Sequence, residues 1–188
     1  MKVEQTALPG VVIITPVVHT DHRGSFRESW QRERYAAAGL PGEFVQDNVS
    51  ISRAGVLRGL HFQHPQPQGK LVTVLRGEIM DVAVDVRRGS PTFAKHVAVT
   101  LSSANERQLW IPEGFAHGFI VLSDEALVHY KVTQPFHAGG DRTIAWNDPE
   151  IGIEWPQSAG PLLSGKDAEG RRLADFAPDE LPSYEPAR

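Results

Sequence analysis

Four side chains that could move a proton or stabilise an anion lie in short, largely apolar runs of this chain. They are His61 in LRGLH, Lys70 in QGKLV, Tyr130 in YKVT and Asp167 in LSGKD. Imidazole, with an unperturbed pKa of about 6.5, suits a general base near neutral pH, and a phenol can donate a proton. A lysine ammonium could stabilise an oxyanion, and an aspartate could orient an imidazole. Each also has an ordinary explanation, because a single histidine or tyrosine in a strand is more often a hydrogen-bonded core residue and such an aspartate more often caps a helix.

A metal site is the other use that histidine indicates, because imidazole is the commonest metal ligand. Two imidazoles on one strand converge when they are two residues apart, but His64 falls on the strand face opposite to His61. His117, in PEGFAHGF, would add a ligand from another segment without a clear carboxylate partner. The chain contains no cysteine, which excludes thiolate ligands, thiolate nucleophiles and disulfides. We therefore expect acid–base chemistry with no metal and no cofactor.

Composition and charge limit the class of protein and its partners. The 188 residues fit one domain, and a hydrophobic content of 40% is enough for a sizeable core. The formal net charge is −4 with both signs interspersed, so nothing indicates a nucleic-acid or membrane surface. The N-terminal apolar run is broken by Pro16 and lacks a basic leader, which predicts a strand rather than a signal peptide. We expect no nucleic-acid partner, no membrane and a cytoplasmic location.

Two strands joined by a proline-broken turn should position most of the candidate side chains. The strands are expected within residues 56–62 and 71–75, and the turn at residues 64–69. In a regular strand, alternation places Arg58 and Phe62 on one face and His61 on the other. Arg58 and Arg23 each lie beside a glycine and could bind phosphate through forked donors, although exposed arginines usually only face solvent.

The remaining elements also read mostly as strands. One further strand is expected at residues 11–14 and 17–18, interrupted at Pro16, and others at residues 44–52, 79–86, 96–101, 108–111, 119–122, 127–133 and 143–146. In residues 79–86 the valines share one face while Asp81 and Asp85 share the other, and Tyr130 shares a face with Val128 and Val132. One helix is expected at residues 31–38 and a helical turn within residues 166–176. About nine strands without βαβ alternation favour an antiparallel sandwich or barrel.

The segments around the candidate residues together resemble one family. The matching segments are DHRGSFRESW, FVQDNVS, VLRGLHFQ, QGKLVTVLRGEIMDVAVDVRRGSPTF, QLWIPEGFAHGFIVLSDEA, YKVT, WNDPEIGIEWP and LSGKD, which span residues 21–167. In order and content they closely resemble dTDP-4-dehydrorhamnose 3,5-epimerases, which are metal-free enzymes. The resemblance implies an all-β fold, a cupin-like double-stranded jelly-roll β-sandwich with a few short peripheral helices. We expect a single domain over residues 1–176 and a loose tail over residues 177–188, which contain three prolines.

The resemblance implies a reaction and a set of site residues. The reaction is epimerisation at C3 and C5 of dTDP-4-dehydro-6-deoxy-D-glucose to dTDP-4-dehydro-L-rhamnose, through a C4 enolate, in dTDP-L-rhamnose biosynthesis. His61 matches the general base, Asp167 its paired carboxylate and Tyr130 the proton donor on the opposite face of the sugar. Lys70 and His117 match residues around the substrate, and Lys70 is the better candidate of the two for stabilising the C4 oxygen. The substrate-binding positions are Arg23, Glu28, Gln46, Asn48, Arg58, His117, Asp141 and Lys166, all of which match the family except Asp141.

The resemblance also implies a homodimer, and the chain departs from the family pattern at two places. N-terminal strands are exchanged between subunits, so Arg23 and Glu28 would serve the neighbouring subunit. Pro135 and Phe136 stand where the family commonly has two tyrosines, the first of which stacks on thymine. Asp141 stands in place of a glutamate that contacts substrate, one methylene shorter.

Other functions are compatible with parts of the pattern. The closest is a single-position epimerase that acts at C3 or C5 only of another nucleotide-linked 4-keto-6-deoxysugar, because the same four candidate residues could serve it. A non-catalytic sugar-binding cupin-like domain has no need of those four residues. A metal-dependent cupin oxygenase or isomerase is the third alternative.

Overall fold

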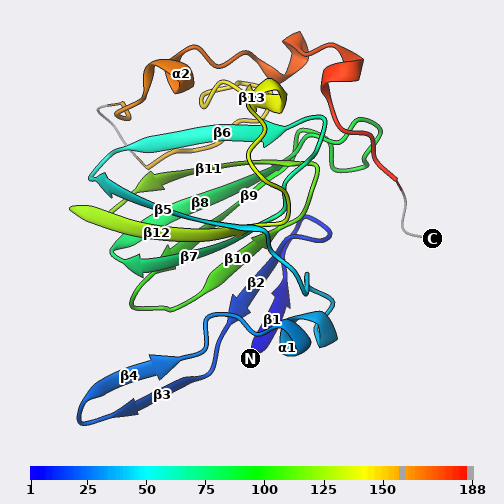
Figure 1. Ribbon diagram of the computed structural model, residues 1–188. Coiled ribbons are helices and arrows are strands. Elements are labelled where there is room, and N and C mark those ends of the chain that lie inside the picture. Colours follow the sequence, from blue (N-terminus) through cyan, green and yellow to red (C-terminus); the bar gives the residue numbers. More distant parts are fainter. Residues whose placement is uncertain (157–159, 186–188) are drawn as a thin grey trace.

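Two antiparallel sheets packed face to face form the body of the molecule, as the computed structural model shows for residues 1–156 and 160–185 (Figure 1). The first sheet has the order β1 (Lys2–Gln5), β2 (Val12–Thr15), β10 (Gln108–Ile111), β7 (Lys70–Arg76), β12 (Glu125–Val132), β5 (Gln46–Arg53). The second has the order β13 (Asp141–Thr143), β6 (Leu57–Gln63), β11 (Phe115–Val121), β8 (Glu78–Asp85), β9 (His96–Ser102). The predicted antiparallel sandwich is confirmed.

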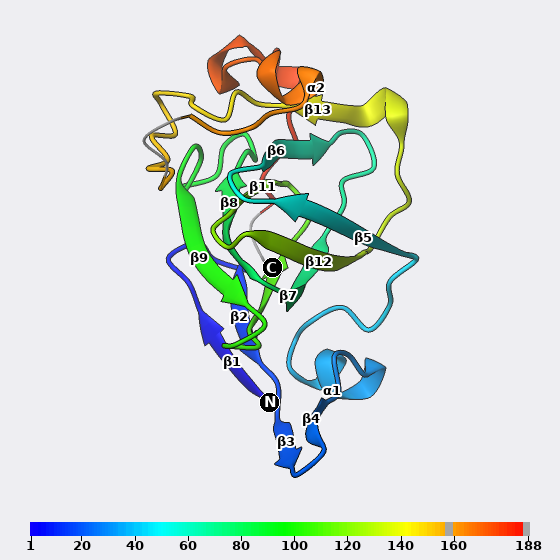
Figure 2. The same ribbon diagram turned by 90° about the vertical axis from the view of Figure 1, so that its left-hand side faces the viewer.

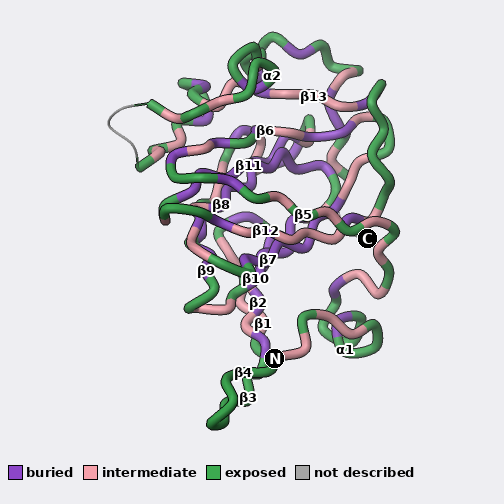
Figure 3. The backbone as a smooth tube through the Cα atoms, turned by 60° about the vertical axis from the view of Figure 1, so that its left-hand side comes forward, coloured by how far each residue is buried: buried purple, intermediate pink, exposed green. Residues whose placement is uncertain are grey.

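Apolar side chains from both sheets fill much of the space between them. This interior cluster includes Val72, Val74, Ile79, Leu101, Leu109, Phe115 and Val128, all buried. They come from strands with the expected two-residue alternation, so burying one face of each strand accounts for the pairing of the sheets. Figure 3 shows the buried positions concentrated in these strands.

Strand β8 is buried on both faces. Ile79 and Ala83 point into the sandwich interior, and by alternation the buried Asp81 and Asp85 point the same way. The valine face of β8 packs instead against a second cluster on the outside of this sheet, formed with Ile144, Ile151, Leu173, Phe176 and Leu181. The predicted alternation is confirmed, but the carboxylate face is the interior one.

The C-terminal segment covers the outer face of the second sheet. It contains α2 (Gly165–Ala168), within the predicted range of a helical turn, and two short 3-10 turns at Leu173–Asp175 and Pro178–Glu180. Leu181 is buried, and the Tyr184 backbone N–H donates to the Arg88 carbonyl at 3.0 Å. This packing differs from the loose tail expected after residue 176; residues 186–188 of that tail lie outside the described residues.

A hairpin and a short helix project from the opposite end of the body. The hairpin pairs β3 (Val18–Asp21) with β4 (Gly24–Arg27), and the turn at His22 and Arg23 forms its tip. Helix α1 (Arg32–Ala37) confirms the predicted helix, with Gln31 accepting from the Arg34 backbone N–H as N-cap. In Figures 1 and 2 the hairpin and α1 lie at one end and α2 and β13 at the other. The hairpin is exposed on nearly all sides (Figure 3).

Candidate active site

A cleft opens between the two sheets where strands β6 and β11 face β7 and β12. It consists of two adjoining cavities of about 390 Å³ and about 300 Å³ that share His61, Lys70, Tyr130 and Lys166. Ten of the twelve predicted site residues line it: His61, Lys70, Tyr130, Asp167, Gln46, Asn48, Arg58, His117, Asp141 and Lys166. The other two, Arg23 and Glu28, do not.

His61 and Asp167 form a close pair at the rim of the cleft. His61 Nε2 lies 2.5 Å from Asp167 Oδ1, and the Asp167 side chain is 5% exposed against 32% for His61. Burial on its own would raise the pKa of Asp167, but hydrogen bonds from His61, Ser164 and the Gly59 backbone N–H hold that pKa below its ordinary value. An ionised carboxylate only accepts hydrogen bonds, so Nε2 carries a proton here. The pairing leaves Nδ1 of His61 free to accept a proton.

A β-bulge places Arg58 on the cleft side together with His61. His61 pairs with His117 on β11 and Arg58 pairs with Phe119, so two residues of β6, Gly59 and Leu60, face a single residue of β11. The prediction that Arg58 and His61 lie on opposite faces is therefore wrong, because it assumed regular alternation. Gly59 permits the bulge: its φ is +117°, and a Cβ there would lie 2.6 Å from backbone atoms of β11.

Lys70 is the buried cation of the cleft wall. It begins β7, where it pairs with Ile111 and Val132, and is 7% exposed. Burial lowers its pKa to about 8, although the negative charges of Asp141, Asp81 and Glu113 act in the opposite direction. An ammonium at this depth can stabilise negative charge that develops on a bound molecule.

Tyr130 approaches the cleft from the other sheet. It lies on β12 between the buried Val128 and Val132, on the predicted face, and packs against the interior cluster. Burial raises the pKa of its phenol, while the charge of Arg58 acts in the opposite direction. The phenol therefore keeps its proton at neutral pH and can donate it.

A second histidine–carboxylate pair lies deeper in the cleft. His117 Nε2 lies 2.6 Å from Oδ1 of the fully buried Asp81. The other oxygen, Oδ2, has no hydrogen-bond partner among the described residues. Sequence reasoning identified His117 but missed Asp81. The only signal for Asp81 was its place on the carboxylate face of β8.

Polar contacts link the remaining predicted binding residues. Gln46 Nε2 donates to Asn48 Oδ1 at 2.8 Å, and Arg58 Nε donates to Ser52 Oγ at 3.0 Å. Lys166 and Asp141 form an ion pair at the edge of the cleft. Phe136, named from the sequence as a departure from the family pattern, also lines the cleft. Gln63, Gln68 and Ser164 line it too and were missed, because they lie in the matching segments without a role of their own assigned to them.

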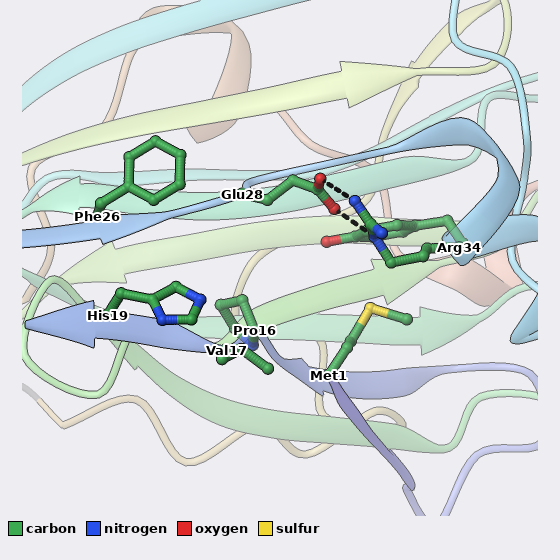
Figure 4. Close-up of a pocket in the computed structure, with 8 residues that line it drawn as sticks. Met1, Pro16, Val17, His19, Phe26, Glu28 and Arg34 are labelled. Carbon is green, nitrogen blue, oxygen red and sulfur yellow. Dashed lines mark hydrogen bonds and ion pairs between the residues drawn. The ribbon is translucent and has the colours of Figure 1, made fainter.

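Arg23 and Glu28 belong to the projecting end of the molecule. Arg23 pairs with Asp21 at the hairpin tip. Glu28 pairs with Arg34 at the end of a separate hollow of about 410 Å³, whose other walls include Val17 and Phe26 (Figure 4). The structure does not bring these two residues to the cleft of their own chain.

Across residues 1–156 and 160–185, no three histidine, aspartate or glutamate side chains come together as a set of metal ligands. Among the described helices, none has the length and apolar character needed to cross a membrane.

A family model described as dTDP-4-dehydrorhamnose 3,5-epimerase matches residues 5–175. The chain belongs to this epimerase family. The dTDP-4-dehydrorhamnose 3,5-epimerase of Pseudomonas aeruginosa is 53% identical over 176 residues, which cover 93% of this chain and 97% of the relative. The Escherichia coli protein of the same name is 50% identical over 183 residues, which cover 96% of each.

Solved structures of dTDP-sugar epimerases share the fold. The dTDP-6-deoxy-D-glucose-3,5-epimerase of Legionella pneumophila, in complex with dTDP-4-keto-L-rhamnose, is 48% identical with a TM-score of 0.96 over 98% of both chains. A 3'-monoepimerase from Streptomyces bikiniensis, in complex with dTDP-quinovose, is 33% identical with a TM-score of 0.89, covering 95% of this chain and 92% of its own. The predicted cupin-like jelly roll is confirmed.

The two departures from the epimerase family pattern fall at the cleft mouth. Phe136 lines the cleft and is 59% exposed, and its backbone N–H donates to Gln46 Oε1 at 3.2 Å. Pro135 does not line the cleft, and its carbonyl accepts from the Gln63 side chain. Asp141 is held by Lys166. Of the two residues that replace the tyrosine pair, Phe136 is therefore the one available to a ligand.

Proposed function

We propose that this chain catalyses the epimerisation of dTDP-4-dehydro-6-deoxy-D-glucose at C3 and C5 to dTDP-4-dehydro-L-rhamnose, a step of dTDP-L-rhamnose biosynthesis. Membership of the epimerase family makes it an isomerase. The observation that carries the proposal is the convergence of His61, Lys70 and Tyr130 on one cleft, with Asp167 paired to His61. The Legionella relative, which has this fold, was solved with dTDP-4-keto-L-rhamnose bound.

The roles proposed for these residues follow from the chemistry of a ketone. A C4 carbonyl makes the hydrogens at C3 and C5 removable, because the remaining charge is delocalised onto the C4 oxygen. We assign proton removal to Nδ1 of His61 and stabilisation of the C4 oxygen to Lys70. Asp167 holds the imidazole and stabilises the imidazolium that forms. The Tyr130 phenol, from the opposite sheet, returns a proton to the other face, so the centre inverts and the ketone is regenerated.

Substrate binding is proposed for the polar residues around this centre. Arg58 and Lys166 are the cations suited to a diphosphate. The Arg58 guanidinium can make two parallel hydrogen bonds to phosphate oxygens, whereas the Lys166 ammonium acts as a point charge. For Lys166 to bind the diphosphate, its ion pair with Asp141 must first break. Gln46, Asn48 and His117 supply further donors, and Phe136 offers an aromatic surface for the base. No step requires a metal or a cofactor.

A homodimer with exchanged N-terminal strands is also proposed. Arg23 and Glu28 lie outside the cleft of their own chain, on the projecting segment that contains β3 and β4 (Figure 1), where Phe26 is 71% exposed. A second subunit would cover that apolar surface and receive those charges in its own cleft. Because the proposed substrate is a nucleotide sugar made in the cell interior, we infer a cytoplasmic location.

A single-position epimerase is the second candidate, favoured by one observation. The Streptomyces bikiniensis 3'-monoepimerase has this fold at 33% identity. The fold therefore also accommodates inversion at one carbon only.

Proton NMR of the product formed from dTDP-4-dehydro-6-deoxyglucose in deuterated water tests the proposal. We expect deuterium at both C3 and C5, inversion of both, and undiminished turnover in EDTA. Deuterium and inversion at one carbon would establish the single-position reaction. No exchange at either carbon would leave a sugar-binding domain, and loss of turnover in EDTA restored by a divalent ion would overturn the metal-free chemistry. His61→Asn, which keeps a polar side chain of similar size, should abolish the exchange.

A further inference from the structure

Ser164 makes two hydrogen bonds with the residue that pairs with His61. It is the N-cap of α2, and its Oγ accepts from the Asp167 backbone N–H at 3.1 Å. The same hydroxyl donates to Asp167 Oδ2 at 2.8 Å. Oδ1 of this carboxylate faces His61 Nε2. The two carboxylate oxygens therefore have separate side-chain partners, and the Gly59 backbone N–H also donates to this carboxylate, which leaves Ser164 as the side chain that holds Oδ2.

The position of Asp167 leaves its carboxylate dependent on such contacts. Asp167 lies on a helix of four residues, Gly165–Ala168, which begins with the exposed Gly165 and is followed by the half-buried Gly170. The torsion that turns an aspartate carboxylate is broad and has no sharp staggered wells. Hydrogen bonds, and not a rotamer preference, must therefore fix the plane of the carboxylate.

Backbone hydrogen bonds fix the position of the chain just before Ser164. Two residues earlier, Leu162 bridges to Val56: the Leu57 N–H donates to the Leu162 carbonyl at 3.0 Å, and the Leu162 N–H donates to the Gly55 carbonyl at 2.8 Å. These bonds hold Leu162 beside the start of β6. Two residues later, Ser164 lines the same cavity as His61 and Tyr130.

We infer that Ser164 is a positioning residue for the proposed proton transfer, holding the Asp167 carboxylate in the orientation that fixes the Nε2–H tautomer of His61. The inference rests on the proposed function. A carboxylate held by Oδ2 presents Oδ1 to His61 and keeps the imidazole proton on Nε2, away from substrate. A carboxylate free to turn lets His61 also adopt the other tautomer, in which Nδ1 carries the proton and cannot act as a base. Ser164 itself touches no reacting atom in this scheme.

Two substitutions separate the hydroxyl from its role as a helix cap. Threonine and glycine are N-cap residues of about equal rank, but only threonine keeps a hydroxyl. We expect Ser164→Thr to retain kcat within about twofold of the wild type, and Ser164→Gly to lower kcat about tenfold at unchanged KM, in keeping with the loss of one hydrogen bond to a charged group. Ser123→Ala is the matched control, because Ser123 Oγ likewise accepts from a backbone N–H, that of Glu78, and donates to an oxygen, the Glu125 carbonyl, in a turn away from the cleft.

A spectroscopic measurement tests the inference without turnover. Long-range 1H–15N spectra of the free protein report which ring nitrogen of His61 carries the proton, with its signals assigned by their absence from His61→Asn. We expect the Nε2–H tautomer in the wild type, Ser164→Thr and Ser123→Ala, and a mixture of tautomers in Ser164→Gly. The same tautomer in the glycine and threonine variants would overturn the inference, even if the wild type proved inactive on every 4-keto sugar. A raised KM at unchanged kcat in Ser164→Gly would also overturn it, since Ser164 would then bind substrate.

Discussion

Burial lowers the pKa of Lys70 to about 8, so that its ammonium loses a proton just above physiological pH. Because its pKa is lowered to about 8, the ammonium becomes a neutral amine as the pH rises through about 8. The proposed enolate then lacks its counter-charge, so we expect kcat/KM, which reports groups of the free enzyme, to fall above about pH 8. In Lys70→Arg the guanidinium stays protonated, and the alkaline fall should disappear from a slower enzyme. A fall at the same pH in that variant would assign it to another group.

Removal of the Tyr130 hydroxyl should separate two events that the wild type couples. Tyr130→Phe deletes one hydroxyl and almost no volume, so packing between Val128 and Val132 should persist. His61 would still remove the proton, but reprotonation would come from the same side. In deuterated water we expect deuterium in the sugar with retained configuration, and inversion slowed by about 10²-fold or more. If exchange and inversion fell together, Tyr130 would not be the acid of the opposite face.

Single residues were predictable from the sequence where a motif marked them, and not where a contact defines them. His61, Tyr130, Lys70 and Asp167 stand in recognisable runs and do meet at one cleft. Asp81 was visible only as half of an alternating carboxylate face, a pattern more typical of solvent exposure. Its contact with His117 depends on how β8 and β11 are aligned, which no local pattern specifies.

At the level of elements, the bulge in β6 decides which side chains reach the cleft. Gly59→Ala would place a Cβ 2.6 Å from Gly118 Cα and the His117 carbonyl oxygen, in a backbone region that only glycine adopts readily. The backbone conformation alone costs about 1–3 kcal/mol, and the collision adds to this. We expect a clear drop in the free energy of unfolding measured with urea, together with loss of activity.

Gly89→Ala provides the comparison for that experiment. Gly89 also has a positive φ, +84°, but a Cβ there meets nothing within 4 Å. It should cost about 1–2 kcal/mol of stability from the backbone alone and leave activity unchanged. Equal losses in the two variants would show that close approach to β11 is not what requires Gly59.

Strand positions were largely predictable, whereas alignment between strands was not. The two-residue period, together with the β-branched and aromatic bias of short runs between turn residues, located β5 to β12 to within a few residues. A bulge shifts every later side chain to the other face, so one extra residue in β6 reversed the predicted relation of Arg58 to His61. The C-terminal prolines indicated a loose tail, but Leu181 packs into the outer cluster, a long-range contact without a local signal.

At the scale of the whole molecule, the proposed dimer predicts complementation between two inactive chains. An Arg23→Ala chain has an intact cleft and a defective hairpin, while a His61→Asn chain has the reverse. If the hairpin serves the partner's cleft, a mixed dimer contains one complete site. Random pairing makes half of the dimers mixed, so roughly a quarter of the sites should be complete after joint refolding.

The readout for this experiment is turnover per subunit, with light scattering to establish the dimer. Each variant refolded alone serves as the control and should stay at its own low activity. A mixture no more active than the average of the two separate variants would contradict the exchange.

The outer cover of the second sheet has a consequence for the order in which the chain matures during synthesis. A ribosome releases residues from the N-terminus onward, and both sheets, through β13, are complete in sequence before α2 and the C-terminal turns emerge. Until then the valine face of β8 lacks Leu173, Phe176 and Leu181, and His61 lacks Asp167. One late docking event therefore shields the nascent sheet and supplies the carboxylate. Before α2 emerges, the nascent chain therefore lacks both the carboxylate that pairs with His61 and Lys166, one of the two cations proposed for the diphosphate.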